Sequence, residues 1–377
     1  MAKVDFREVR KERAMPFLVL LFLFVVPFGQ AAVLPDASSH AVYFKGAVAQ
    51  PGLLNAALTR GLPTYRRLVK VTGSNGQYRS TMEVEGYSLK DLLDRIQVKK
   101  EDDGFNLALD TYITVKGRGG EQTLLSYSEA YLASDGGPLL VERARLLLPH
   151  HHQSLGDDNS NPTILHNAEE RSGLNLQSCS SCHTGNTAPV LSVPQGWMLV
   201  IPSDDSSRRY VEDVVEINVH QVGISVKDTR ATAKNVVIDV PVLVGPDGKQ
   251  TPLTAQRYSR APKSTWQDMT FGLGKGFHGH HTWQGTSLDA LLRPLLPPGT
   301  DPSKTWVLVT AADGYRSLFS GSEIFAAPEG KNVLLADRED GQALGAGSGR
   351  YHIVSKSDFF IDRSVRQVKE IRIGRIQ

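Results

Sequence analysis

The chain of 377 residues contains one short motif twice. The first copy reads Gly86-Tyr87-Ser88-Leu89-Lys90-Asp91-Leu92-Leu93, and the second reads Gly285-Thr286-Ser287-Leu288-Asp289-Ala290-Leu291-Leu292. In each copy a serine precedes leucines at helical spacing, which predicts a short helix with Ser88 or Ser287 as its N-cap. Further landmarks follow both motifs in the same order. This ordered recurrence predicts an internal duplication.

The later landmarks fix the fold class. They are, in the first and second copy respectively, 112–115 and 307–310, 126–129 and 320–323, 138–143 and 333–338, 196–201 and 349–354, and 211–217 and 365–371. Val214, Ile217 and Val219 have the near-period-2 spacing that is typical of a half-buried strand, and Val368, Ile371 and Ile373 repeat it. We therefore predict a β-rich α+β fold that occurs in two tandem domains, residues 33–219 and residues 220–377.

The repeat unit resembles the molybdopterin-binding domain of the sulfite oxidase family. The likeness lies in the G-x-x-L-x-x-L-L helix motif, in a V-x-A-x-D-G-Y strand and turn at residues 309–315, and in the closing strand pair. The resemblance implies two sulfite-oxidase-like domains in tandem. That family binds molybdenum through a cysteine thiolate ahead of the helix motif, and neither copy has a cysteine there. We therefore expect no molybdopterin.

Both cysteines of the chain lie in one pentapeptide, Cys179-Ser180-Ser181-Cys182-His183. This is C-x-x-C-H, the attachment pattern of a c-type haem, in which each thiol bonds one vinyl group and the histidine binds the iron. The pattern predicts one covalent haem c, held by Cys179 and Cys182, with His183 as the proximal ligand. Two alternatives stay open: a small disulfide, and half of a zinc site completed by nearby histidines.

The N-terminal segment favours the haem. Basic residues (Lys3 to Arg13) precede an apolar run over 15–28 and the small residues 29–32, which is the layout of a secretory signal peptide. The run is short for a membrane span, although an uncleaved N-terminal anchor over 1–32 is the alternative. We expect a periplasmic or extracellular protein, in the compartment where bacteria attach haem.

The two copies differ in one loop. Between its parallel landmarks the second copy needs only residues 339–348, whereas the first copy spans residues 144–195. This insertion of about 50 residues contains the haem motif. A loop of this length inside a compact domain usually has a function. The sequence therefore predicts a haem-bearing insertion on domain 1.

Histidines in two regions are candidates for the distal iron ligand. The insertion holds His150, His151, His152 and His166, and a glycine-rich stretch of domain 2 holds His278, His280 and His281. We rank His150, His151 and His152 first because they share the insertion with the motif. Bis-histidine ligation would give a low potential, because a thioether ligand raises it. We assign Met198 to the core and His40, His220 and His352 to structural roles.

The leading functional hypothesis is a mono-haem c-type cytochrome that passes electrons between periplasmic or membrane redox partners. The sequence contains no legible acid–base or nucleophile constellation, so an electron-transfer protein is favoured over a catalyst. One alternative is a molybdopterin-dependent oxidoreductase with a haem relay, in which Arg316, Arg350 and Arg363 would pair with the pterin phosphate. Another is a haem-bearing assembly or binding subunit of a larger complex. The formal net charge of +2 predicts no nucleic-acid partner.

Overall fold

The computed structural model describes residues 41–72, 78–101, 103–149, 163–167, 196–223, 238–272, 274, 276–326, 333–345 and 347–376. The predicted signal peptide lies outside the described residues. His40–Gln377 forms one compact unit. The fold is α+β and rich in strands, which confirms that part of the prediction. Below, "first half" means the described residues up to 223, and "second half" those from 238.

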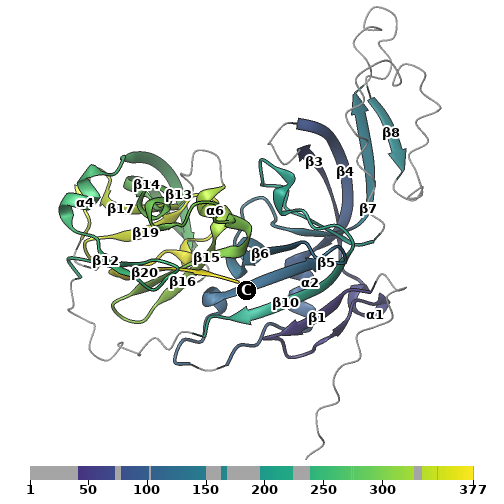
Figure 1. The fold of residues 1–377 in the computed structure, drawn as a ribbon, viewed down its shortest axis with the longest axis horizontal. Helices are drawn as coiled ribbons and strands as arrows, with labels where there is room; N and C mark the ends of the chain where they lie inside the picture. Colours follow the sequence, from purple (N-terminus) through teal and green to yellow (C-terminus); the bar gives the residue numbers. More distant parts are fainter. Residues whose placement is uncertain are drawn as a thin grey trace, which may run out of the picture. The chain divides into compact units, whose positions relative to one another are not determined.

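The elements of the first half are coloured purple to teal in Figure 1. They are β1 (Tyr43–Gly46), β2 (Gly52–Leu53), α1 (Ala56–Thr59), β3 (Thr64–Thr72), β4 (Tyr78–Ser88), α2 (Leu89–Ile96), η1 (Ala108–Asp110), β5 (Thr111–Gly117), β6 (Gln122–Ser126), α3 (Tyr127–Tyr131), β7 (Leu139–Pro149), β8 (Thr163–Asn167), β9 (Met198–Val200), η5 (Ser207–Arg209) and β10 (Val214–Gln221).

The elements of the second half are coloured green to yellow. They are β11 (Val242–Val244), β12 (Gln250–Pro252), α4 (Ala255–Arg260), β13 (Ser264–Gly272), β14 (Gly276–Ser287), α5 (Leu288–Leu292), η7 (Arg293–Leu295), η8 (Pro302–Lys304), β15 (Thr305–Ala311), β16 (Arg316–Ser320), α6 (Gly321–Phe325), β17 (Val333–Glu339), β18 (Gln342–Ala343), β19 (His352–Ser355), η10 (Ile361–Arg363) and β20 (Val368–Arg375).

The same sheet topology occurs in both halves. One sheet has the order β2-β1-β10-β5-β6 in the first half and β12-β11-β20-β15-β16 in the second. The other has the order β3-β4-β7-β8 with β9 on β7, and β13-β14-β17-β18 with β19 on β17. Each half therefore places its closing pair, β9 and β10 or β19 and β20, in two different sheets.

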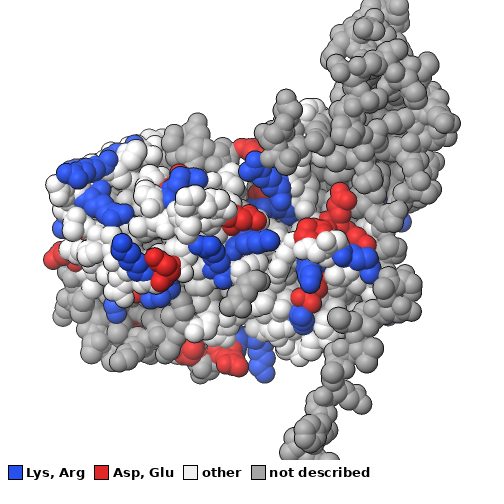
Figure 2. Space-filling model, viewed as in Figure 1, with Lys and Arg blue, Asp and Glu red and all other residues white. Residues whose placement is uncertain are grey.

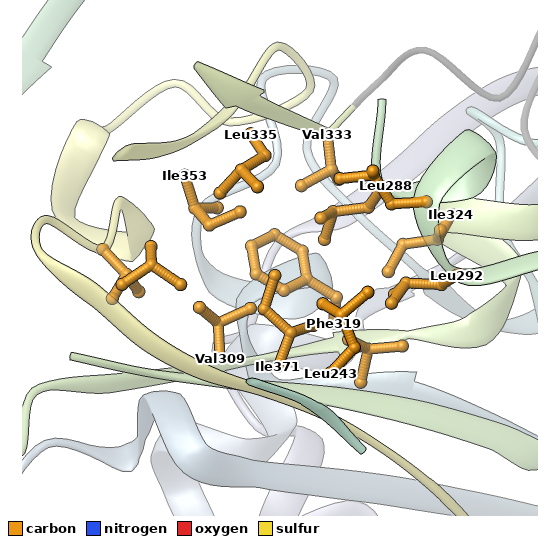
Figure 3. Packing of buried hydrophobic residues seen from close by; sticks show 14 of the residues in the cluster. Leu243, Leu288, Leu292, Val309, Phe319, Ile324, Val333, Leu335, Ile353 and Ile371 are labelled. Carbon is orange, nitrogen blue, oxygen red and sulfur yellow. The ribbon is translucent and has the colours of Figure 1, made fainter. Parts of the chain in front are cut away.

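The apolar core of each half lies between its sheets and its short helices. Figure 3 shows the core of the second half, where Leu335 and Ile353 from one sheet meet Val309 and Ile371 from the other around Phe319. Helix α5 adds Leu288 and Leu292, and α6 adds Ile324. Burial of side chains of this size stabilises the folded state by about 1.5–3 kcal/mol each. The leucines of the recurring motif are therefore the contacts that close the core.

The glycine that opens each motif copy lies at a β-bulge. A Cβ on Gly86 would lie 2.2 Å from the carbonyl oxygen of Leu140, and one on Gly285 would lie 2.2 Å from that of Leu335. The register shifts at both glycines, next to Glu85 in the first half and Gln284 in the second. The strand must approach its neighbour closely before the chain turns into the helix, so only glycine fits.

The predicted helices follow these bulges. Ser287 caps α5, because its side chain accepts a hydrogen bond from the backbone of Ala290. Ser88 lies at the same position before α2 but makes no capping hydrogen bond through its side chain. The prediction of a serine N-cap is therefore confirmed in full only for the second copy.

The hairpin after β7 differs between the halves. In the second half β17 and β18 are joined by the two residues Asp340 and Gly341. In the first half β7 continues to Pro149 and pairs with β8, with Leu146 opposite His166. The returning strand β9 also pairs with β7. The additional residues of the first half therefore follow β7, and the segments β8 and β9 that come after it both pair with β7.

No helix within the described parts of the chain is long and apolar enough to cross a membrane.

Candidate functional site

The predicted haem attachment site, Cys179, Cys182 and His183, lies outside the described residues. So do the first-ranked distal candidates His150, His151 and His152. His166 lies in β8, and its backbone pairs with Leu146 of β7. These ligand assignments stay predictions.

The other distal candidates lie on β14. His278 and His280 are exposed, and the ring of His280 meets that of Phe277 edge-on at 5.7 Å. His281 is partly buried, and its Nδ1 lies 2.8 Å from Oε1 of Glu339 on β17. The ring of His281 also lies beside Trp283, with centroids 5.6 Å apart. His281 thus has a carboxylate environment that His278 and His280 lack among the described contacts.

The sheet β13-β14-β17-β18, which carries His281, has buried polar side chains at positions where the equivalent sheet of the first half has apolar ones. The strand registers show which positions of the two halves are equivalent. Thr270, Trp283 and His352 occupy the positions that Val71, Val84 and Met198 have in the first half. All six side chains are buried, and those of the first half form one apolar cluster. Atoms Oγ1 of Thr270, Nε1 of Trp283 and both ring nitrogens of His352 have no hydrogen-bond partner. The second half therefore holds a group of buried polar atoms that its fold does not require.

His352 is the most buried of these groups. It is 1% exposed, packs edge-on against Trp283 at 5.2 Å and lines a cavity of about 250 Å³ with Tyr315 and Arg366. Burial, with a smaller effect of the Arg366 charge, lowers the pKa of His352 to about 3. The imidazole is therefore neutral at physiological pH. The predicted core position of Met198 is confirmed, and His220 hydrogen-bonds Thr114 at 2.8 Å.

A buried polar network joins the two halves. Each half has a capping box, Ser126 with Glu129 before α3 and Ser320 with Glu323 before α6. The two boxes meet, because Oγ of Ser126 donates to Oε2 of Glu323 at 2.9 Å.

Two arginines complete this network in equivalent ways. Arg209 of η5 pairs with Glu129 and Asp204, and lies 3.3 Å from the hydroxyl of Ser320 in the other half. Arg363 of η10 pairs in the same way with Glu323 and Asp358, and lies 3.3 Å from the hydroxyl of Ser126. We call these eight residues the seam. They are Ser126, Glu129, Asp204, Arg209, Ser320, Glu323, Asp358 and Arg363.

Burial dominates the electrostatics of the seam. It raises the pKa of Glu129 to about 7 and that of Asp358 to about 6, although the arginines oppose the shift. Burial alone would lower the pKa of Arg209 and of Arg363, but their carboxylate partners raise both above the usual value. Both guanidinium groups therefore stay charged and hold the buried carboxylates.

A cavity of about 400 Å³ adjoins the seam and is lined by residues of both halves. Its lining includes Glu129, Glu323 and Asp358 of the seam, together with the loop residues Asp205 and Asp301. Over the face in Figure 2, lysine and arginine side chains are interspersed with aspartate and glutamate. The described charges on that face therefore form no extended field of one sign.

The arginines considered for phosphate binding have other partners. Arg316 is buried, pairs with Asp103 and donates to Oδ2 of Asp110 at 2.7 Å. Arg363 belongs to the seam, whereas Arg350 is exposed and lies over the ring of Tyr351 at 5.6 Å. Two of the three guanidinium groups are thus committed to internal ion pairs, and these are the groups of Arg316 and Arg363.

Sequence reasoning missed the seam, although its signals were present. The capping boxes are Ser-x-x-Glu segments that had been matched between the copies, and their buried glutamates attract the two arginines. Arg209 and Arg363 each precede a landmark valine, Val211 or Val365, by two positions. A pair of arginines at equivalent places in two halves with the same sheet topology indicates a shared structural role.

Comparisons with known proteins identify no family for this chain. No family model matches it, and no curated protein is significantly similar to it. One similar solved structure is the sulfane dehydrogenase SoxCD from Paracoccus pantotrophus, with 11% identity and a TM-score of 0.29 over 90% of this chain and 79% of that chain. A likeness at this level does not assign an activity.

Proposed function

We propose that the chain is an exported mono-haem c-type cytochrome, built on a duplicated sulfite-oxidase-like scaffold, that transfers electrons between periplasmic or membrane redox partners. The observation that carries the proposal is the C-x-x-C-H segment at residues 179–183, which contains every thiol of the chain. Its position supports the proposal, because it lies in the one long insertion by which the first half differs from the second.

The described strands support a haem-bearing insertion at this place. The chain leaves the sheet at the end of β7, and both β8 and β9 pair with β7 on the way back. Leu139 and Val141 of β7 lie opposite Val200 and Met198 of β9, so the return of the insertion is anchored in the core. The insertion that carries the motif is therefore joined to the sheet of the first half at both of its ends.

The buried charges favour an electron carrier over a catalyst. Glu129 and Asp358, which have the strongly raised carboxyl pKa values, are each held by an arginine of the seam. Perturbed groups in such structural ion pairs do not by themselves indicate an active site. Among the described residues, the seam therefore serves the fold.

The decisive experiment is to produce the full chain in a bacterial host that has haem-attachment machinery. We expect haem staining on a denaturing gel, an intact mass increased by one haem, and about one iron and no molybdenum per chain. Cys182→Ala should lose normal two-thioether attachment, whereas the control Ser181→Ala should retain it. Wild-type protein without the added haem mass would overturn the proposal.

The distal ligand has a separate readout. We expect bis-histidine ligation, with His150, His151 or His152 supplying the second nitrogen. The near-infrared charge-transfer band of the oxidised protein distinguishes this from methionine ligation. A methionine-type band would contradict the ligand assignment, and a high-spin spectrum would indicate an open coordination position and a catalytic or ligand-sensing role.

A further inference from the structure

Three metal-ligating side chains converge at one edge of the polar sheet in the second half. Nδ1 of His281 lies 2.8 Å from Oε1 of Glu339 and 3.5 Å from Oδ2 of Asp340. The three ligand atoms all lie within 4.8 Å of one another. Bonds of about 2.0–2.2 Å to one metal ion separate adjacent ligand atoms by roughly 3.0–3.5 Å, and both distances from His281 are close to this range.

The contact between His281 and Glu339 is not a hydrogen bond. Although the two atoms are close, Nδ1 is a buried atom with no hydrogen-bond partner, because the carboxylate oxygen lies off the direction of the ring nitrogen. Two ligands of one ion have this relation, since each points at the ion rather than at the other.

Among the described residues, His281 is the one basic side chain within ion-pair distance of the two carboxylates of the cluster. Within the described chain, neither Glu339 nor Asp340 forms an ion pair with a lysine or an arginine. Asp268, opposite His281 on β13, adds a third carboxylate, and Lys356 is the cation near it. The local excess of negative charge favours a bound cation.

The scaffold holds the ligands in place. Oδ1 of Asp340 accepts a hydrogen bond from the backbone of Thr282 at 2.7 Å, and the Asp340 amide donates to the Thr282 carbonyl at 2.8 Å. One carboxylate oxygen is therefore used to fix the turn, and the other faces His281. Nδ1 of His281 is buried, but Glu339 is partly exposed and Asp340 is exposed, so an ion can enter from the side of the carboxylates.

The first half provides an internal comparison. The residues at the positions of Asp268, His281 and Glu339 are Val69, Met82 and Ala144, and all three are buried in an apolar cluster. The fold therefore forms at this place without any polar side chain, and the polar set in the second half needs another explanation.

We propose that His281, Glu339 and Asp340 bind one divalent transition-metal ion. Imidazole with carboxylates suits Zn²⁺ and its neighbours, and three protein ligands leave further positions for water. The site is independent of the haem, because it uses none of the residues of the attachment motif.

The test is a calorimetric titration of the untagged full chain, as purified, with Zn²⁺. We expect one Zn²⁺ site in the wild-type protein. In His281→Ala and in Glu339→Gln the affinity for Zn²⁺ should fall by about tenfold or more, since changes to residues around the ligands already lower metal affinity by about tenfold to a hundredfold. The matched control is His280→Ala, which removes an exposed neighbouring imidazole and should leave binding unchanged. Circular dichroism checks folding, and Glu339→Gln decides the matter if His281→Ala does not fold.

Each contrary result has a distinct meaning. Equal binding by wild type and His281→Ala would overturn the proposal, and so would an equal loss in His280→Ala, which would indicate chelation by surface histidines. A changed haem spectrum in His281→Ala would also overturn it, because the imidazole would then bind the iron. A second Zn²⁺ site that is lost on thiol alkylation would count against the haem proposal alone.

Discussion

Replacing His352 by methionine should make the protein more resistant to acid. The change gives the second half the residue that the first half has at Met198, in an equivalent sheet register. Methionine is flexible and apolar, so it fits beside Trp283 and removes two buried nitrogens that have no partner. We expect the variant to be at least as stable as wild type at pH 7.5.

The magnitude follows from the histidine titration. Burial lowers the pKa of His352 to about 3, against 6.5 for an unperturbed histidine. Below pH 6.5 the imidazole of His352 takes up a proton in the unfolded state but stays neutral in the folded state. The stability associated with the neutral imidazole is thus present above pH 6.5 and is lost as the pH falls towards 3. The loss is about 1.4 kcal/mol per pH unit, or about 2.7 kcal/mol at pH 4.5.

Urea unfolding between pH 8 and pH 4, followed by far-ultraviolet circular dichroism, measures this effect. The difference in unfolding free energy between His352→Met and wild type should grow steadily below pH 6.5. The reciprocal variant Met198→His should show the opposite trend, because it places an imidazole in an apolar cluster. Parallel pH profiles for wild type and His352→Met would refute the reasoning.

Three further predictions concern stability in urea. Arg363→Met should lower the free energy of unfolding by about 3–5 kcal/mol at pH 7.5, because it leaves Glu323 and Asp358 buried without their cation. The control Arg66→Met removes an exposed arginine and should lower it by less than about 1 kcal/mol, and equal losses would contradict the role of the seam. Gly285→Ala should destabilise the protein by about 1–3 kcal/mol through the clash with Leu335, and an unchanged midpoint would contradict the bulge. Glu129→Gln should become more stable relative to wild type as the pH rises from 4.5 to 7. The pKa of Glu129 is raised in the folded state, so the unfolded wild-type chain releases this proton first and wild type loses stability over that range. A difference in unfolding free energy that stays constant with pH would show that Glu129 does not titrate there.

Much of the fold was predictable because its signals are local. The leucines of the recurring motif mark a helix, and Ile217 and Val219 have the two-residue spacing of a strand. The order of strands within each sheet was not predictable, because β1 pairs with β10 across most of the first half and no local pattern encodes that contact. The strand boundaries were also shifted, as β10 begins at Val214 rather than at Val211.

The candidate sites were less predictable, because they depend on which side chains meet. The sequence pointed to His281 as one histidine among several, but Glu339 and Asp340 join it only through the pairing of β14 with β17. Arg363 read as a possible anion ligand, yet burial commits it to Glu323. A charged residue looks the same in a sequence whether it faces a ligand or closes an internal ion pair.

The seam has a consequence for the modularity of this protein. Arg209 of one half contacts Ser320 of the other, and Arg363 contacts Ser126 in the equivalent way, as the two surfaces of an isologous dimer do. Neither half is therefore structurally independent. Removing one half would leave a buried hydroxyl and an arginine of the other half without their partners. A substitution in the seam of one half changes the contacts of the other half, so the two halves can differ in their outer sheets but depend on each other at the seam.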